Sequence, residues 1–303
     1  MRIADLTSVE LARRMRTGLL WRAGPFVVRL TTTAPIFPDQ FLLLYGEHPL
    51  LDGSFGDVTD FHIELARGQG IRRWWRPKIF FSMDGPNPLA PFPLDHALPL
   101  FEWGFNYAIA TRANQYLLLH TAVVARGNRA LLLPGLPGSG KSTLCAALVL
   151  NGWRLLSDEF ALVRPATGEI VPLPRSITLK NASIAIIRAY DSSAVLGPEF
   201  PKTRKGTVAH MRPPVSSVRA ANDVAFATWV VCPHFHKEAH ALMDPIPKDH
   251  GFLRLAGNAF NYELQGVRGF RAVARMIRGC QMYDLSFGEL TTAVALLEEL
   301  TAS

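Results

Sequence analysis

One continuous stretch carries the clearest chemical pattern of the chain, because Gly135 to Thr143 fit the phosphate-binding P-loop pattern G-x-x-x-x-G-K-[ST]. Glycines let several backbone N–H groups point into one concavity, and the positive end of a following helix faces the same anion. We expect Lys141 to reach the β- and γ-phosphates of ATP, and the Ser142 hydroxyl to bind Mg²⁺. The residues predicted to bind the nucleotide are Gly135, Leu136, Pro137, Gly138, Ser139, Gly140, Lys141, Ser142 and Thr143.

The segments on either side of this stretch agree with the motif. Residues 129–133 form a short apolar run typical of a buried strand, and residues 144–150 are apolar and helix-compatible up to the helix stop at Asn151 and Gly152. The sequence therefore predicts a strand, a glycine loop and a helix, which is the context that phosphate binding requires. The alternative is a glycine-rich turn between a strand and a helix that binds no ligand.

Two adjacent carboxylates, Asp158 and Glu159, follow the next predicted strand at residues 153–157. Carboxylates at such a place can hold Mg²⁺ and take a proton from an attacking hydroxyl. In a parallel P-loop sheet we expect this strand to lie beside the P-loop strand, so that its end faces the γ-phosphate. We predict Asp158 as the general base and place Ser142 and Glu159 on the metal side, although either carboxylate could be a metal ligand. The alternative is a solvated strand end or a helix cap.

His120 lies on a predicted strand at residues 116–124, which a turn at residues 126–128 joins to the P-loop strand. We expect it beside Asp158 as a catalytic neighbour, although a lone histidine on a strand is more often a satisfied core residue. Residues 197–214 are polar and basic and predict a loop. A cationic loop could clamp a γ-phosphate, but on charge alone a solvated loop is the better interpretation.

The region from residue 1 to about 95 is predicted to be a smaller, mixed but mainly β domain, separate from a domain at 96–303. Phe26–Leu30, Phe41–Tyr45 and Asp60–Leu65 resemble strands, and a proline-rich stretch up to Pro93 marks the boundary. We expect this region to position an acceptor or to organise assembly, without a catalytic group.

Basic and aromatic residues alternate in the N-terminal region from Arg72 to Phe81. Such a stretch can bind nucleic acid, but we favour an antiparallel strand whose arginine stems cover apolar surface. A helix is predicted over His96–Arg112, where it would link the two halves.

Bulk properties indicate an ordinary soluble chain of 303 residues with a formal net charge of +7. A basic balance suits anionic ligands such as nucleotides, but it is not specific. Three separated cysteines, Cys145, Cys232 and Cys280, form neither a metal spacing nor an even disulfide set. With no signal peptide and no membrane-length apolar run, we expect a cytoplasmic protein without a membrane partner.

His120, the P-loop and the pair Asp158–Glu159 together resemble the catalytic domain of HPr serine kinase/phosphorylase. The wider chain is similar to the HprK-related kinases of bacterial gene clusters. The wider cues are Phe101-Glu102-Trp103-Gly104, Leu119-His120-Thr121-Ala122, Ser157-Asp158-Glu159-Phe160, Leu179-Lys180-Asn181, Lys205-Gly206-Thr207-Val208-Ala209-His210 and Phe260-Asn261-Tyr262.

This resemblance implies an α/β fold with a P-loop kinase domain of HPr kinase/phosphoenolpyruvate carboxykinase type. It implies phosphorylation of a hydroxyl that depends on ATP and Mg²⁺, with a peptide, a protein or a small molecule as acceptor. It also implies that Lys205 neutralises charge on the transferred group, and that the chain forms a homo-oligomer as HPr kinase does. The chain departs from the family in having Asp158–Glu159 where HPr kinase has two aspartates, and in lacking its glycine-rich downstream signature.

Two other functions remain open on the sequence alone. Small-metabolite kinases of shikimate-kinase type also place an acidic residue on the strand after the P-loop helix, but they lack the long preceding region and the β hairpins expected here. A nucleotide-binding regulatory module with little turnover would also carry a P-loop. Nucleic acid is not an expected partner.

Overall fold

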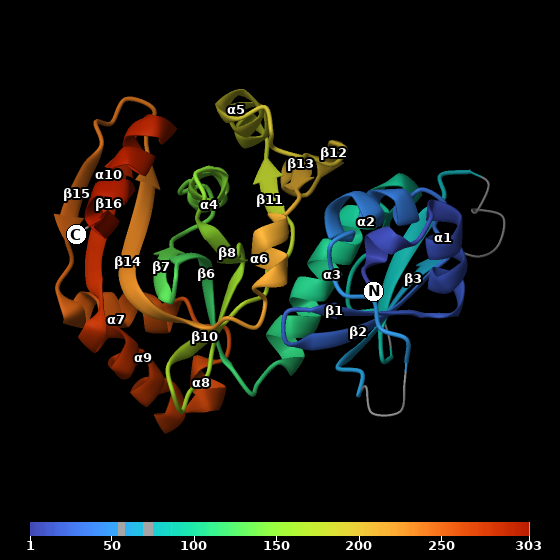
Figure 1. Ribbon diagram of the computed structural model, residues 1–303, viewed down its shortest axis with the longest axis horizontal. Coiled ribbons are helices and arrows are strands. Elements are labelled where there is room, and N and C mark those ends of the chain that lie inside the picture. The colour runs from blue at the N-terminus through green and yellow to red at the C-terminus, as the bar shows by residue number, and fades with distance from the viewer. Residues whose placement is uncertain (54–57, 69–74, 86, 303) are drawn as a thin grey trace.

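The computed structural model describes residues 1–53, 58–68, 75–85 and 87–302 of a mixed α/β protein (Figure 1). Arg72, Arg73 and Trp74, from the basic and aromatic stretch of the sequence, lie outside the described residues. The N-terminal part of the chain contains both helices and strands: η1 (Ile3–Asp5), α1 (Ser8–Thr17), β1 (Leu19–Ala23), β2 (Phe26–Thr32), α2 (Phe37–Tyr45), β3 (Phe61–Arg67), β4 (Lys78–Met83), β5 (Phe92–Pro93), η3 (Leu94–His96) and α3 (Ala97–Arg112).

The first sheet has its strands in the order β1-β2-β3-β4-β5, with β2 and β3 parallel and the other neighbours antiparallel. Its strands alternate as the sequence predicts: in β3, Phe61, Ile63 and Leu65 are buried, whereas His62 and Glu64 are exposed. The predicted strands at residues 26–30 and 60–65 are therefore confirmed, and the exposed face of the sheet is polar.

The predicted strand at Phe41–Tyr45 is wrong, because these residues belong to helix α2. Pro38 lies in the first turn of α2, where its fixed φ favours a helix start. Phe37, Phe41 and Tyr45 recur every four residues and are buried on one face. The apolar run is thus a buried amphipathic helix. Hydrophobicity alone cannot distinguish a helix from a buried strand in a run of this length.

Helix α3 confirms the helix predicted over His96–Arg112 and packs against both α2 and the first sheet. Gly104 allows the close approach of β4, since a Cβ at this position would lie 2.1 Å from the Phe81 ring. One apolar core contains Phe101 and Phe105 of α3 together with Phe160 and Phe200 from later in the chain. The core around α3 therefore includes side chains from both sides of the predicted boundary near residue 95.

The second sheet is larger and has mixed strand directions, with the order β10-β9-β6-β7-β14-β16-β15 and β8 paired to β6. Strands β7, β14 and β16 are parallel, whereas the other pairs are antiparallel. The bounds of its strands and of the P-loop helix are β6 (Leu117–Arg126), β7 (Arg129–Pro134), α4 (Lys141–Leu150), β8 (Arg154–Ser157), β9 (Phe160–Val163), β10 (Glu169–Val171), β14 (Ala225–Phe235), β15 (Leu242–Pro245) and β16 (Gln281–Phe287).

The expected position of the strand before Asp158 is wrong. Strand β8 pairs with β6 and does not lie beside the P-loop strand β7. The reason is the tight β6–β7 hairpin at residues 126–129, which places β6 on that side of β7. Strands β8 and β9 then share β6, because β8 pairs with Val123–Ala125 and β9 pairs with Leu117–His120. The acidic pair lies at the junction between them.

The stretch at residues 197–214 is not the predicted loop. It contains strands β12 and β13, which form a small sheet of order β11-β13-β12. The apolar residues Val208, Ala209 and Met211 are buried in it, and Gly206, with φ of +84°, permits the tight turn. The remaining elements are β11 (Ile177–Lys180), α5 (Ala182–Tyr190), β12 (Phe200–Thr203), β13 (Gly206–Met211), α6 (Val215–Arg219), α7 (Lys248–Gly257), α8 (Tyr262–Gln265), α9 (Val267–Gly279) and α10 (Leu290–Ala302).

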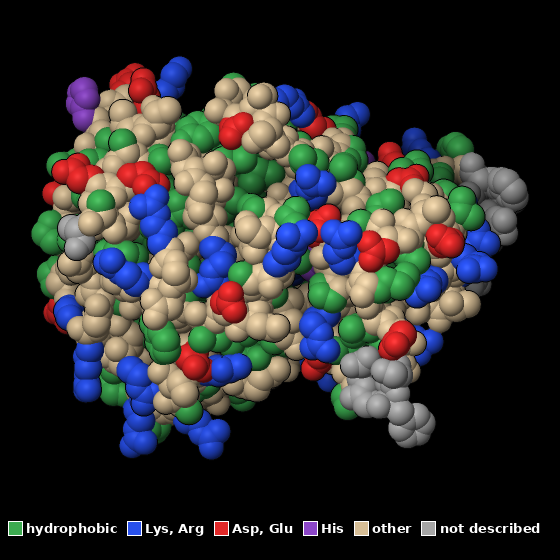
Figure 2. All heavy atoms as spheres, in the orientation of Figure 1, with side chains coloured by type: hydrophobic (Ala, Val, Ile, Leu, Met, Phe, Trp, Pro, Cys, Tyr) green, Lys and Arg blue, Asp and Glu red, His purple; other side chains and the backbone are tan. Residues whose placement is uncertain are grey.

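Helices cover both faces of the second sheet. Side chains of α4 and α10 form one apolar core with it, and side chains of α7 and α9 form another. Basic and acidic side chains are interspersed over the face shown in Figure 2. Within the described part of the chain, none of the helices has the length and apolar character needed to cross a bilayer.

Candidate nucleotide-binding and phosphate-transfer site

The P-loop stretch has the local structure that its sequence predicts. Strand β7 ends at Pro134, a glycine-containing loop follows, and α4 begins at Lys141. The loop is closed by a hydrogen bond from the Ser139 N–H to the Leu136 carbonyl, at 3.2 Å. The end of the parallel strand β14 braces it, because the Phe235 N–H donates to the Ser139 carbonyl at 3.2 Å.

Two glycines make this loop possible. Gly138 has φ of +89° and Gly140 has φ of +93°, a backbone region that residues with a Cβ seldom adopt. At Gly140 the space is also limited, since a Cβ would lie 2.9 Å from the ring of Phe287. The glycine positions of the motif are thus explained by conformation and by packing at the start of α4.

Lys141 lies mostly inside the loop, with 8% of the residue exposed. Its ammonium group donates to the carbonyls of Gly135 and Leu136. Burial lowers the pKa of Lys141, and the carboxylates of Glu159 and Asp158 oppose that shift only in part. A buried cation held over the loop carbonyls and close to two acids is well placed to meet an anionic ligand.

The acidic pair is held at the bend between β8 and β9. The Ser157 hydroxyl accepts the N–H groups of Glu159 and Phe160, at 3.4 and 3.1 Å, and the Glu159 carbonyl accepts the Thr121 N–H at 3.2 Å. The bend directs the two side chains into different surroundings, so that the two carboxylates have different chemistry.

Asp158 is buried, with 7% of the residue exposed. Its Oδ2 accepts the Thr178 N–H at 3.0 Å, whereas its Oδ1 is buried without a hydrogen-bond partner among the described residues. Burial, together with the neighbouring charge of Glu159, raises the pKa of Asp158 to about 6, although the Thr178 N–H and the Ser142 hydroxyl stabilise its charge. Asp158 is thus a buried carboxylate with an unused oxygen beside the P-loop serine, and nearby positive charge offsets its burial only in part.

Glu159 is more open, and its Oε1 lies 3.4 Å from Nε2 of His120. Burial acts to raise the pKa of Glu159, but His120, Lys205 and Lys180 outweigh it and hold the pKa below its usual range. The ring of His120 packs at 5.4 Å from that of Phe260, and its backbone N–H donates to the Asn258 carbonyl at 2.7 Å. His120 is therefore beside an acid, as predicted, but its partner is Glu159.

Lys205 lies in the turn between β12 and β13, with its ammonium group 5.2 Å from the centre of the Trp103 ring. The positive charge of Lys205 lowers the pKa of both Glu159 and Lys141, so Lys205 lies close enough to act on them electrostatically. The structure thus brings Lys205 to the same site as the P-loop lysine.

Sequence reasoning missed Lys180. It lies at the end of β11, two residues after Thr178, and its charge lowers the pKa of Asp158, Glu159 and Lys141. The hydroxyl of Ser183 fixes its backbone by accepting the Lys180 N–H at 2.7 Å and donating to its carbonyl at 2.6 Å. Its only signal in the sequence was its place in the Leu179-Lys180-Asn181 cue.

No cluster of three or more His, Cys, Asp or Glu side chains suited to a metal occurs in the described part of the chain. Mg²⁺ at nucleotide sites, however, takes only one or two protein carboxylates and completes its shell with phosphate oxygens and waters. Ser142 and the unused oxygen of Asp158 meet that smaller requirement. The three cysteines are all free and buried.

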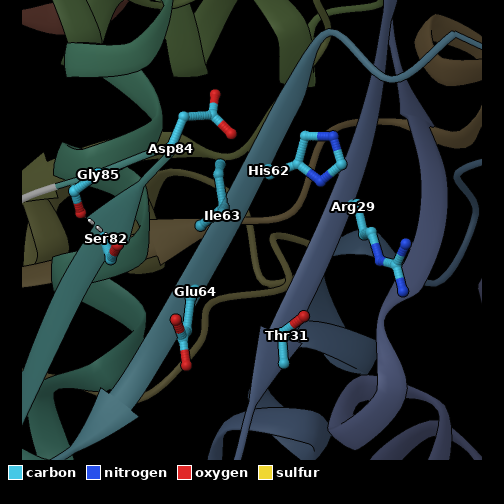
Figure 3. A pocket seen from close by; sticks show the side chains of 8 residues that line it. All are labelled: Arg29, Thr31, His62, Ile63, Glu64, Ser82, Asp84 and Gly85. Atoms are coloured by element: carbon cyan, nitrogen blue, oxygen red, sulfur yellow. Dashed lines mark hydrogen bonds between the residues drawn. The ribbon is translucent and has the colours of Figure 1, made fainter.

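A shallow hollow of about 490 Å³ lies elsewhere, on the polar face of the first sheet (Figure 3). Arg29, His62, Glu64 and Asp84 line it, on strands β2 to β4 and the residue after them. It contains neither a P-loop residue nor a member of the acidic pair. The hollow therefore does not belong to the phosphate site.

No protein-family model matches the chain, and a search of the curated proteins finds no match. The resemblance to HPr kinase consequently rests on the motif residues and on the way in which they converge.

Proposed function

We propose that the protein is an ATP- and Mg²⁺-dependent kinase that transfers the γ-phosphate to a hydroxyl group. The observation that carries the proposal is the convergence of Lys141, Asp158, Glu159, His120 and Lys205, which come from separate segments of the chain. Phosphoryl transfer needs positioned cations for the phosphates and a carboxylate for the nucleophile, and this set supplies both.

The phosphates would lie in the P-loop. Backbone N–H groups at the start of α4 and the ammonium group of Lys141 would bind the β- and γ-phosphates. Lys180, at the end of β11, and Lys205, between β12 and β13, would neutralise charge on the transferred group. The site would therefore offer cations from three separate segments of the chain, which suits a transition state with charge on its equatorial oxygens.

Ser142 and Asp158 would hold Mg²⁺. They fit because Oδ1 of Asp158 is buried without a partner among the described residues, and because the Ser142 hydroxyl stabilises the same carboxylate. When bound, the ion would shield the phosphate charges from the acceptor hydroxyl. Its own charge would also stabilise the ionised form of a carboxylate that burial alone disfavours.

Glu159 would then be the carboxylate that receives the proton of the acceptor hydroxyl, with His120 orienting it. Its side chain is 32% exposed and thus accessible to an acceptor, whereas Asp158 is enclosed. A low pKa is compatible with this role, since in a loose transition state the proton leaves late and positioning matters more than basicity. This assignment exchanges the roles of Asp158 and Glu159 expected from the sequence.

The transfer assay should compare Asp158→Asn with Glu159→Gln, using γ-labelled ATP and separate pools of serine-containing peptides and hydroxylated metabolites. We expect Glu159→Gln to lower transfer by roughly 10²–10⁴-fold with nucleotide binding intact. We expect Asp158→Asn chiefly to raise the Mg²⁺ requirement. If instead Asp158→Asn abolishes transfer and Glu159→Gln raises the Mg²⁺ requirement, Asp158 is the base, as the sequence predicts. If neither substitution changes transfer, the catalytic site lies elsewhere in the protein.

The same assay separates the remaining alternatives. Labelling of a metabolite but of no peptide would identify a small molecule as the acceptor, as in the small-metabolite kinases of shikimate-kinase type. Tight ATP binding without labelling of any acceptor, together with negligible ATP consumption, would favour a regulatory module. The proposal is a peptide, protein or small-molecule kinase, and the acceptor pools determine which.

A further inference from the structure

A buried polar network joins the N-terminal region to the small β11–β13–β12 sheet. At its centre, Glu102 of α3 is 2% exposed at its side chain and forms an ion pair with Arg175 at 2.6 Å. The other carboxylate oxygen of Glu102 accepts the Tyr45 hydroxyl at 2.5 Å and the Ser176 hydroxyl at 2.7 Å. Arg175 also donates to the side chain of Asn106 at 2.7 Å.

These partners are distant in the sequence but adjacent in space. Tyr45 ends α2, Glu102 lies in the middle of α3, and Ser176 immediately precedes β11. A buried charge is costly unless it is paired and fully hydrogen-bonded, and both oxygens of Glu102 have partners here. The best-attested use of such a network is to fix one arrangement of the elements it joins.

The network is connected to Asp158 through one short strand. Ser176 is followed by Ile177 and Thr178, and the Thr178 N–H donates to Asp158 at 3.0 Å. Two residues of strand span about 7 Å, so a shift of the strand start moves this N–H directly. Lys180 lies two residues further along the same strand and faces the same site.

We propose that Tyr45 and Glu102 are positioning residues for phosphoryl transfer: by holding Ser176 and Arg175 they set the register of β11, and β11 presents Thr178 to Asp158 and Lys180 to the phosphates. The inference rests on the proposed function, because transfer is what the positioned groups would perform. It assigns to the N-terminal region a part in the geometry of the site, beyond acceptor binding or assembly.

The test is Tyr45→Phe in the full-length chain, which removes one hydroxyl and keeps the buried ring. We expect kcat for transfer to fall about threefold to tenfold, the range of one hydrogen bond, with the Kd for ATP unchanged within about twofold. Glu102→Gln removes the charge at the centre and should lower kcat further, in the same direction. The separation of kcat from nucleotide affinity distinguishes misplaced catalytic groups from loss of the P-loop.

The matched control is Ile63→Val, a small change in the same N-terminal core at a residue that is not part of the hydrogen-bonded network. A purely structural role for Tyr45 predicts equal kcat for the two variants at equal loss of stability, and that result would overturn the proposal.

A second readout needs no turnover. Hydrogen–deuterium exchange over residues 174–181 should become faster in Tyr45→Phe and stay unchanged in Ile63→Val. If wild-type protein transfers no phosphate, the proposed function fails, while this exchange measurement still decides whether Tyr45 holds β11. Unchanged exchange in Tyr45→Phe would refute the positioning role by itself.

Discussion

Replacing Asp158 with asparagine should make the ligand-free protein more stable at pH 8. In the folded state the pKa of Asp158 is about 6, against an ordinary value of 3.8, because the side chain is buried beside Glu159. The difference of roughly two units corresponds to about 3 kcal/mol of destabilisation by the ionised form. Asparagine removes this cost, and the loss of the charged acceptor for Thr178 needs no further subtraction because the pKa of about 6 already includes that hydrogen bond.

The expectation is a gain of about 3 kcal/mol, or about 5 °C in melting temperature for a chain of this length. The sign of the pH dependence follows from the raised pKa. The cost is absent below the unfolded pKa, develops as pH rises between 3.8 and about 6, and is complete above that range. The advantage of Asp158→Asn should thus shrink to about half at pH 5 and disappear near pH 4.

Urea unfolding of the two proteins at pH 4, 5 and 8 measures this difference. Glu159→Gln is the matched control with the opposite sign, because the pKa of Glu159 is held below its usual range and its charge stabilises the fold at pH 8. The reasoning is refuted if Asp158→Asn is less stable than wild type at pH 8, or if the difference between them does not change with pH.

Three further outcomes are expected. Gly140→Ala should lower the free energy of unfolding by roughly 1–3 kcal/mol and weaken ATP binding, because Gly140 has a positive φ and an added Cβ would lie 2.9 Å from the Phe287 ring. Gly152→Ala is the control in urea unfolding: Gly152 has a similar φ but open space around it, so this substitution should cost less. Lys180→Ala should reduce transfer by roughly 10–10²-fold with little change in ATP affinity, whereas the exposed Lys237→Ala should leave both unchanged. Deleting residues 1–93 should expose the apolar face of α3 and yield aggregated protein on gel filtration, and a soluble monomer that binds ATP would contradict this.

Local patterns in the sequence were sufficient for the P-loop, for most of the strands of the second sheet and for α3, because strand alternation and glycine placement are set by near neighbours. These local patterns failed where contacts between distant segments of the chain determine the secondary structure or the strand order. Whether Phe41–Tyr45 is a helix depends on what it packs against, and the position of β8 depends on the β6–β7 hairpin. Hydrophobicity alone carries neither kind of information.

In the candidate site, too, some residues could be predicted from local motifs and others could not. Lys141 and Ser142 are fixed by the P-loop motif, and the acidic pair was found by its distance from that motif. The pairing of His120 with Glu159 depends on β6 and β9 sharing an edge. Lys180 and the Tyr45–Glu102 network depend on segments that are far apart in the chain, so no local pattern could have indicated them.

The most direct test of the central claim is calorimetric titration of ATP with Mg²⁺ into wild-type protein and Lys141→Ala, with circular dichroism to verify the fold of both. The account predicts that wild type binds ATP and that the variant loses about 10–150-fold in affinity, the worth of hydrogen bonds from a charged group at 1.5–3 kcal/mol. Equal affinity in two folded proteins, or no binding by wild type, would contradict the assignment of this loop as a nucleotide site.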